Sequence, residues 1–226
     1  MKITFVTTFR SLIEPYFEDS VLKKARDRGA FAVDFINPRD FSRDRWKKTD
    51  DIVSGGGAGM LMTCQPLFDA LKFARSRAPK ARIIFPLPAA KPFNNRDARR
   101  LASRDEIVFV CGRYEGIDER VIETFADEVF SVGDFVVTGG ELPAAMMSDA
   151  ILRFVGGVLG DETSAIDESF ETGLLEAPNF TKPAVFKDRG VKRGAPDVLL
   201  NGNHKMIAAY RNSLAKLKTL WFRPDL

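Results

Sequence analysis

Histidine, cysteine and long apolar runs are scarce in this chain. Its 226 residues include one histidine and two cysteines. The lone histidine, His204, is the only possible base of a Ser-His-Asp triad, and no Gly-x-Ser-x-Gly elbow supports one. Two cysteines cannot form a disulfide framework, which favours a reducing, cytoplasmic location. No apolar run approaches the roughly 20 residues of a membrane span, so we expect no membrane partner.

The chain also lacks the common nucleotide and metal motifs. The glycine-rich segment Ser54–Met60 does not end in Gly-Lys-Ser/Thr, and no stretch matches G-x-G-x-x-G. Phosphate-loop hydrolysis and hydride transfer are therefore disfavoured. No cluster of histidine and cysteine has metal-ligand spacing, so the sequence identifies no metal ligand.

Charge is unevenly distributed along the chain, whose net value is +3. Residues 176–226 contain ten Lys/Arg and four Asp/Glu, a balance of +6, which leaves −3 for residues 1–175. A basic C-terminal quarter suggests a polyanionic partner such as RNA. A solvated basic surface would have the same composition, and charge alone does not separate the two.

Short apolar segments alternate with amphipathic ones through residues 1–160. This alternation predicts an α/β fold with a mainly parallel sheet. The expected strands are Lys2–Thr7, Phe31–Ile36, Arg82–Pro86, Ile107–Cys111 and Glu128–Val132, and the expected helices are Ile13–Arg28, Pro66–Arg77, Arg96–Ser103, Asp118–Phe125 and Pro143–Val155. The polar segment 161–175 is predicted to be a flexible linker. A small basic helical domain, residues 176–226, follows with a last helix at Lys205–Leu217.

Three loops follow strands of this predicted sheet: Leu87–Pro92, Gly112–Gly116 and Gly133–Gly140. In parallel sheets the ligand usually binds beyond the carboxyl ends of the strands. We therefore expect these loops to converge on one site.

The segment Cys111–Asp118 (CGRYEGID) is one candidate for that site. An apolar strand ends at glycine, and Asp118 is a good residue to begin a helix. Tyr114 offers a stacking surface, while Arg113 and Glu115 offer charge. An ordinary turn between a strand and a helix would have a similar sequence.

The segment Ser131–Pro143 (SVGDFVVTGGELP) is the second candidate. It is unusually apolar for a loop, so it must pack against the core, another subunit or a flat ligand. Its backbone amides are suited to the edge of an adenine. A hairpin packed into the core is the alternative.

Arg153, Asp167 and Glu168 form the third candidate. An arginine on an otherwise apolar helix needs a partner or a function. A linker carboxylate that becomes ordered over substrate would serve as a general base. Alternatively, both acids are ordinary solvent-exposed residues of the linker.

Six segments, in their order and spacing, resemble the bacterial tRNA (guanine-N1)-methyltransferases of the SPOUT α/β-knot superfamily. They are Gly55–Met60, Cys111–Val121, Ser131–Gly160, Ser169–Leu175, Ala177–Pro183 and Leu199–His204. The long third segment is the most specific. The resemblance covers nearly the whole chain.

The resemblance implies a deep trefoil knot in residues 1–160 that binds S-adenosylmethionine. The implied cofactor-binding residues are Leu87, Pro88, Gly112, Tyr114, Glu115, Ser131, Val132, Gly133, Phe135, Val137, Thr138, Gly139, Gly140 and Pro143. It also implies a homodimer with active sites at the subunit interface. The implied tRNA-binding residues are Gly57, Ser169, Lys182, Asn203 and His204.

The implied reaction methylates N1 of the guanine at tRNA position 37, next to the anticodon. N1 carries a proton in neutral guanine, so a base must remove it, and the guanine must leave its stack. Arg153 matches the family arginine that stabilises charge at O6. Magnesium is a possible further cofactor.

This chain departs from the family at several positions. Glu168 stands where the family base is an aspartate, and Asp167 precedes it; side-chain length favours Asp167. The family Ser-Pro-Gln-Gly loop reads Leu87–Ala90 here, and Val53–Ser54 replaces Pro-Tyr. A non-catalytic RNA-binding protein that retains the knotted fold is therefore the alternative function.

Overall fold

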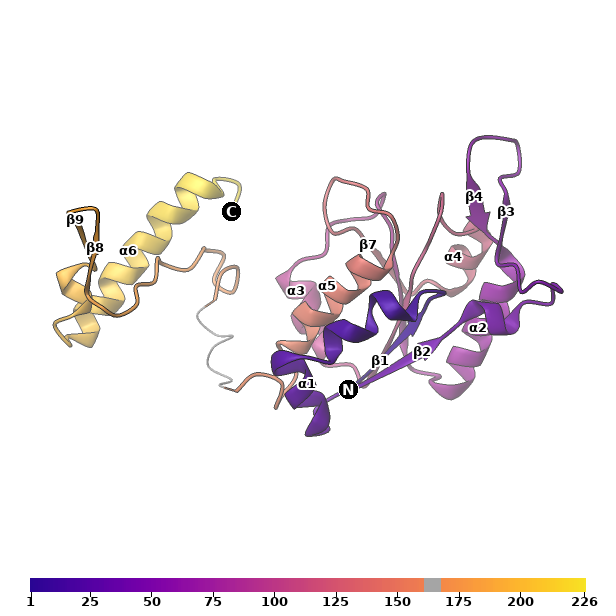
Figure 1. Cartoon of the computed structure of the whole chain (residues 1–226), viewed down its shortest axis with the longest axis horizontal. Helices are drawn as coiled ribbons and strands as arrows, with labels where there is room; N and C mark the ends of the chain where they lie inside the picture. The colour runs from indigo at the N-terminus through magenta and orange to yellow at the C-terminus, as the bar shows by residue number, and fades with distance from the viewer. Residues whose placement is uncertain (161–167) are drawn as a thin grey trace. The chain divides into compact units, whose positions relative to one another are not determined.

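The computed structural model describes residues 1–160 and 168–226. The chain divides into two compact units, Met1–Glu162 and Thr163–Leu226. A five-stranded sheet lies in the first unit, and a two-stranded hairpin with a long helix lies in the second (Figure 1). Within the described ranges, no helix is long and apolar enough to cross a membrane.

The central sheet has the order β2-β1-β6-β5-β7. Every neighbouring pair of strands is parallel. This confirms the predicted α/β class with a mainly parallel sheet. The strands are β1 (Lys2–Val6), β2 (Ala32–Ile36), β5 (Arg82–Pro86), β6 (Glu106–Val110) and β7 (Glu128–Phe130). The inner strands are runs of Ile, Val and Phe because helices cover both of their faces.

Five helices bury their apolar sides in two separate cores. The helices α1 (Ser20–Asp27), α3 (Asn95–Ala102) and α5 (Glu141–Leu152) contribute to one core, and α2 (Cys64–Arg77) and α4 (Glu119–Phe125) to the other. Phe109 of β6 lies in the first core and Val110 in the second. Successive strand residues point to opposite faces, so the two cores lie on the two sides of the sheet. The strand ends remain free to carry a site.

A second hairpin, β3 (Asp50–Ile52) and β4 (Met60–Met62), carries the glycine-rich segment at its tip. Short 3-10 helices complete the first unit at η1 (Arg10–Leu12), η2 (Glu14–Phe17) and η3 (Pro38–Phe41).

The predicted continuous helix Ile13–Arg28 is wrong. The structure has η2, then a break, and α1 begins at Ser20. The Asp19 carboxylate accepts a hydrogen bond from the Ser20 amide at 2.6 Å, and Ser20 has φ of 57°. The apolar periodicity concealed this break because Phe17 and Leu22, on either side of it, are both buried. The other predicted strands and helices are present, with ends shifted by a few residues.

The second unit is built on α6 (His204–Phe222), which extends beyond the predicted Lys205–Leu217. The Asn203 side chain begins this helix by accepting a hydrogen bond from the Met206 amide at 3.2 Å. A hairpin that the sequence did not predict, β8 (Val185–Asp188) and β9 (Val191–Gly194), precedes it, followed by η5 (Asp197–Leu199).

Candidate active site

A pocket of about 170 Å³ lies where the chain leaves β5, β6 and β7. All three predicted loops reach it. Its lining contains all the predicted cofactor residues except Gly133 and Thr138: Leu87, Pro88, Gly112, Tyr114, Glu115, Ser131, Val132, Phe135, Val137, Gly139, Gly140 and Pro143. The structure adds Pro86, Gly116, Ile117, Phe130 and Val136. Pro86 and Phe130 are the last strand residues before their loops, a position that the sequence pattern could have indicated.

The turn after β6 is held in an unusual conformation. Tyr114 has φ of 59°, a left-handed value that is uncommon for residues with a side chain and concentrates at functional sites. The Glu115 amide donates to the Met60 carbonyl at 2.9 Å, which ties the turn to the glycine-rich hairpin. Asp118 caps α4 by accepting from the Arg120 amide at 3.1 Å, as predicted. The turn is therefore fixed at both ends, and Tyr114 is left half exposed at the pocket.

The loop between β7 and α5 passes close to both neighbouring loops. The Ser131 amide donates to the Lys91 carbonyl at 2.9 Å, and the Phe93 amide donates to the Ser131 carbonyl at 2.8 Å. At its far end the Gly140 amide donates to the Gly112 carbonyl at 2.8 Å. Glycine is needed at position 140 because a Cβ there would lie 2.8 Å from the Gly112 nitrogen. These contacts close the pocket wall with backbone.

A buried charge network lies behind this wall. Glu141 is 2% exposed, and its carboxylate accepts a hydrogen bond of 2.8 Å from the Thr7 hydroxyl. Arg113 Nε lies 3.0 Å from Glu141 Oε2, an ion pair without hydrogen-bond alignment. Arg113 also donates to the Thr138 carbonyl at 3.2 Å and covers the ring of Phe9. The network joins the residue that follows β1, the turn after β6 and the start of α5. Thr138 therefore supports the pocket wall through its contact with Arg113 and is not part of the pocket lining.

The pocket's chemistry fits a flat nucleoside group. Leu87, Val137 and Phe130 supply apolar walls. The Ser131 hydroxyl is buried and has no hydrogen-bond partner among residues 1–160 and 168–226. Such an unsatisfied group in a pocket is suited to a polar ligand atom. Ligands of drug size usually occupy about 300–1,000 Å³, so this pocket of about 170 Å³ has room for a base-sized group only.

Arg153 lies at the far end of α5 from the pocket. It caps the C-terminus of the helix, whereas Gly140 and Pro143 lie at its start. Twelve helical residues separate these ends, a span of about 18 Å. Beside it, burial raises the pKa of Asp149, and the Arg153 charge opposes that rise. Within one chain the structure does not bring Arg153 to the pocket.

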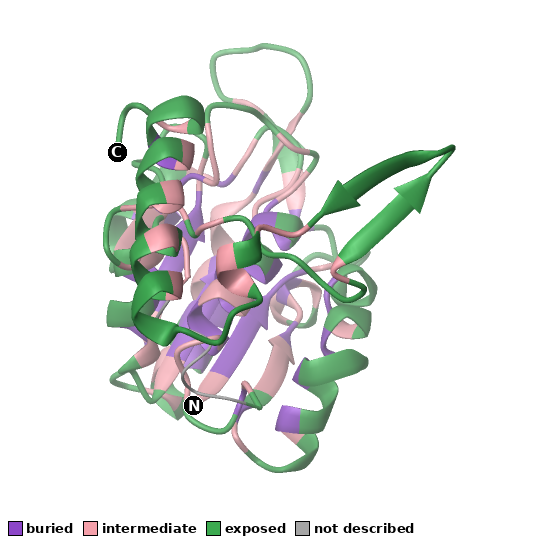
Figure 2. Cartoon of the chain, turned by 90° about the vertical axis from the view of Figure 1, so that its left-hand side faces the viewer, coloured by how far each residue is buried: buried purple, intermediate pink, exposed green. Residues whose placement is uncertain are grey.

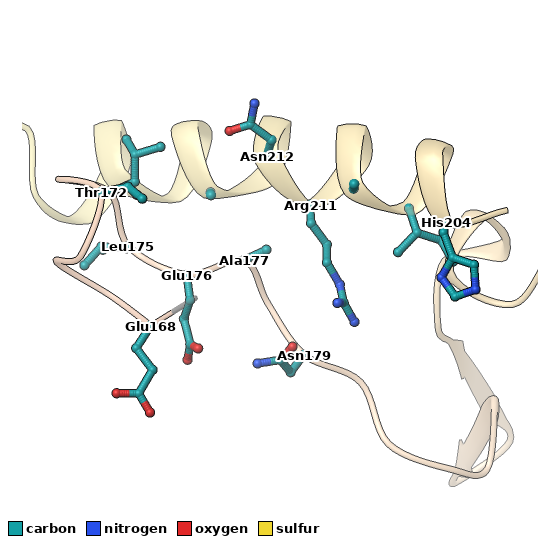
Figure 3. Close-up of a pocket in the computed structure, with 13 residues that line it drawn as sticks. Glu168, Thr172, Leu175, Glu176, Ala177, Asn179, His204, Arg211 and Asn212 are labelled. Carbon is teal, nitrogen blue, oxygen red and sulfur yellow. The ribbon is translucent and has the colours of Figure 1, made fainter. Parts of the chain in front are cut away.

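The predicted catalytic acids fall in the second unit's sequence. Asp167 lies outside the described residues. Glu168 lines a groove of about 870 Å³ together with His204 and Arg211 (Figure 3). In Figure 3 the Arg211 side chain extends from α6 towards Asn179, while the Glu168 carboxylate lies nearer the other end of the groove.

A tight turn follows Glu168 and is joined to α6 by a hydrogen bond. The Ser169 hydroxyl accepts a hydrogen bond of 3.0 Å from the Glu176 amide, and the Phe170 amide donates to the Leu174 carbonyl at 2.8 Å. The Leu175 amide then donates to the buried Thr219 hydroxyl of α6 at 2.8 Å. Residues 168–175, which the sequence placed in a flexible linker, therefore form a hydrogen-bonded turn that is joined to the helix through Leu175.

The predicted tRNA-binding residues are distributed over both units. His204 lines the groove, and Asn203 caps the same helix end. Lys182 lines a neighbouring cavity of about 850 Å³ that also contains Arg211. Gly57 belongs to the first unit and is exposed in the hairpin loop between β3 and β4. In the described part of the chain, no three acidic, histidine or cysteine side chains converge on a possible metal position.

Comparison with known sequences places this chain in a family. The profile described as tRNA (Guanine-1)-methyltransferase TrmD matches residues 1–226. A tRNA (guanine-N(1)-)-methyltransferase of Campylobacter jejuni (strain 81116 / NCTC 11828) is 52% identical over 100% of this chain and 97% of its own length. Those of Campylobacter curvus and Sulfurimonas denitrificans are 53% and 52% identical, over 94% and 96% of their own lengths and 100% of this chain. The chain belongs to the tRNA (guanine-1)-methyltransferase family.

Proposed function

We propose that this protein transfers a methyl group from S-adenosylmethionine to N1 of the guanine at tRNA position 37. The observation that carries the proposal is the backbone-lined apolar pocket at the carboxyl ends of β5, β6 and β7. It belongs to a chain whose family is named for methylation of guanine in tRNA. A tRNA substrate is consistent with a cytoplasmic enzyme.

Residues of the pocket are suited to hold this cofactor, which supplies an electrophilic methyl group on a positively charged sulfonium. The apolar walls and nearby backbone amides would receive the adenine. Ser131 would donate or accept one hydrogen bond that it lacks within the described chain. Glu115 brings a carboxylate to the lining, where negative charge favours a bound cation.

Methylation of guanine at N1 needs a base that removes the N1 proton and a cation that stabilises the charge at O6. Asp167 or Glu168 would take the N1 proton, and side-chain length favours Asp167. Arg153 would stabilise the negative charge that develops at O6. We propose no magnesium ligand, since in residues 1–160 and 168–226 no set of three suitable side chains comes together.

The position of Arg153 supports a homodimer with shared sites. If Arg153 acts at the pocket, the span of α5 requires that a second chain supply it. The pocket loop and the start of α5 also expose large apolar side chains, with Val136 79% and Leu142 61% exposed. Exposed apolar side chains that lie close together indicate a protein interface. We propose that this surface is the dimer interface.

We further propose that residues 1–160 form a trefoil knot that binds the cofactor. The loop 131–140 contacts both the 87–93 loop and the turn at Gly112 before α5 begins. Such a path is suited to a chain that threads through its own earlier loop. Residues 161–175 would connect this domain to a tRNA-binding domain, residues 176–226, which carries the positive balance of charge.

A methylation assay tests the reaction. Purified protein, S-adenosylmethionine and unmodified tRNA should yield 1-methylguanosine at position 37, mapped by nuclease digestion and mass spectrometry. Protein that binds tRNA tightly but yields no methylguanosine would establish the non-catalytic RNA-binding alternative instead. Asp167→Asn should then abolish turnover while Glu168→Gln retains it; the opposite pattern would reassign the base to Glu168.

Subunit mixing tests the shared site. Val137→Glu places a carboxylate among the apolar walls, and Arg153→Ala removes the cation, so each homodimer should be inactive. When the two are unfolded together and refolded, random pairing should restore about a quarter of the wild-type sites, since each heterodimer has one complete site. No restoration, with heterodimers verified by mass, would mean that each site is built within one chain.

A further inference from the structure

The β8–β9 hairpin is fully exposed and has no role in the proposed chemistry. All eight strand residues are exposed, and Figure 2 shows both strands green along their length. The connecting residues, Arg189 and Gly190, have φ of 46° and 82°. Two positive φ values in a two-residue loop are those of a type I′ turn, in which Asn, Asp and Gly are favoured. Turn geometry therefore does not explain an arginine at position 189.

The strand register places two lysines opposite each other. Lys187 pairs with Lys192, and Phe186 pairs with Arg193. Side chains of directly paired residues lie on the same face with Cβ atoms about 4.5–5.5 Å apart, where like charges repel. An exposed two-stranded hairpin is only marginally stable by itself. The lysine pair therefore destabilises a hairpin that is only marginally stable by itself.

The hairpin as a whole is strongly basic. Residues 185–194 hold four cations (Lys187, Arg189, Lys192 and Arg193) against Asp188, a balance of +3. Within the described part of the chain, none of these cations forms an ion pair with an acidic side chain. Phe186 is 59% exposed on the face opposite the lysine pair. A bound polyanion would remove the repulsion that the register creates.

We propose that the β8–β9 hairpin is a phosphate-binding arm, in which Lys187 and Lys192 together contact the sugar–phosphate backbone of tRNA. The inference rests on the proposed function, because tRNA is the polyanion that the second unit must hold. Cations on a narrow ribbon can follow a phosphate backbone, and the exposed ring of Phe186 is available for stacking on a base. The arm would strengthen binding without reading sequence.

The salt dependence of tRNA binding tests this arm directly. Each lysine–phosphate contact contributes about 0.7–0.9 to the slope of log affinity against log salt. The Lys187→Gln/Lys192→Gln variant should therefore show a slope smaller by about 1.4–1.8. Between 50 and 200 mM salt, its affinity should fall roughly tenfold less than that of the wild type. Its thermal midpoint should stay the same or rise, since the repulsion is removed.

Matched controls separate the outcomes. Lys72→Gln/Lys80→Gln removes the same charge from exposed positions of the first unit and should keep the wild-type slope. If the wild type methylates tRNA but the hairpin variant keeps its slope, the arm is refuted while the function stands. A wild type that neither binds nor methylates tRNA would refute the proposed function. If the hairpin variant keeps its slope but no longer binds phosphatidylglycerol vesicles, the hairpin is a membrane-binding element and the proposal is overturned.

Discussion

Substituting Gly140 by alanine should distort the pocket without straining the local backbone. Gly140 has φ of −74° and ψ of −7°, values that alanine adopts freely. The added methyl group, however, would lie 2.8 Å from the Gly112 nitrogen and 2.9 Å from the Cys111 Cα. Both are backbone atoms that cannot rotate away. The turn after β6 and the start of α5 must therefore move apart.

The expected cost has two parts. Forcing one extra methyl group into a packed site destabilises a protein by about 1–3 kcal/mol. The separation also stretches the 2.8 Å hydrogen bond from the Gly140 amide to the Gly112 carbonyl, in the wall of the pocket. Loss of about 1.4 kcal/mol of cofactor binding corresponds to tenfold weaker affinity. We expect S-adenosylmethionine binding to weaken at least tenfold.

Urea unfolding measures the loss of stability, and titration calorimetry measures the loss of affinity for the cofactor. Gly160→Ala is the matched control, because a Cβ there meets nothing within 4 Å and its φ is not in the left-handed region. It should be neutral in both assays. The Gly140→Ala variant could instead lose less than about 0.5 kcal/mol of its free energy of unfolding and bind the cofactor within twofold of the wild type. In that case the close approach of Gly140 to Gly112 is not essential to the pocket.

Three further predictions follow from buried groups. Glu141→Gln removes the counter-ion of Arg113 and should lower the free energy of unfolding by roughly 3 kcal/mol; a urea curve within 1 kcal/mol of the wild type would contradict this. Ser131→Ala should weaken S-adenosylmethionine binding by about 0.5–1.5 kcal/mol, two- to twelvefold, while leaving the thermal midpoint unchanged. If calorimetry gives the variant the same affinity as the wild type, the Ser131 hydroxyl does not bind the cofactor. Burial raises the pKa of both cysteine thiols, that of the fully buried Cys111 well above its usual value. Because Cys64 is only partly buried, iodoacetamide at pH 8 should label the native protein at Cys64 first. Comparable labelling at Cys111 in peptide mass spectra would indicate that the core opens.

The sheet and its helices were largely predictable because their signals are local. Runs such as Arg82–Pro86 and Glu128–Val132 carry the apolar character that a buried parallel strand requires. The break near Asp19 was not predictable from periodicity, since the apolar pattern continues across it. The hairpin of β8 and β9 was also missed, because its strands, VFKD and VKRG, lack the alternation of apolar and polar residues that marks a strand with one buried face.

The sequence by itself determined the class of fold, the three loops that form the pocket and the family. These follow from residue patterns that act over a few neighbours, together with motifs whose order spans the chain. Only the tertiary structure showed the approach of Gly140 to Gly112, the charge network around Glu141, and the distance that α5 sets between Arg153 and the pocket. Such facts depend on segments far apart in the sequence, and their contacts are fixed by packing and strand order, which local propensities do not encode.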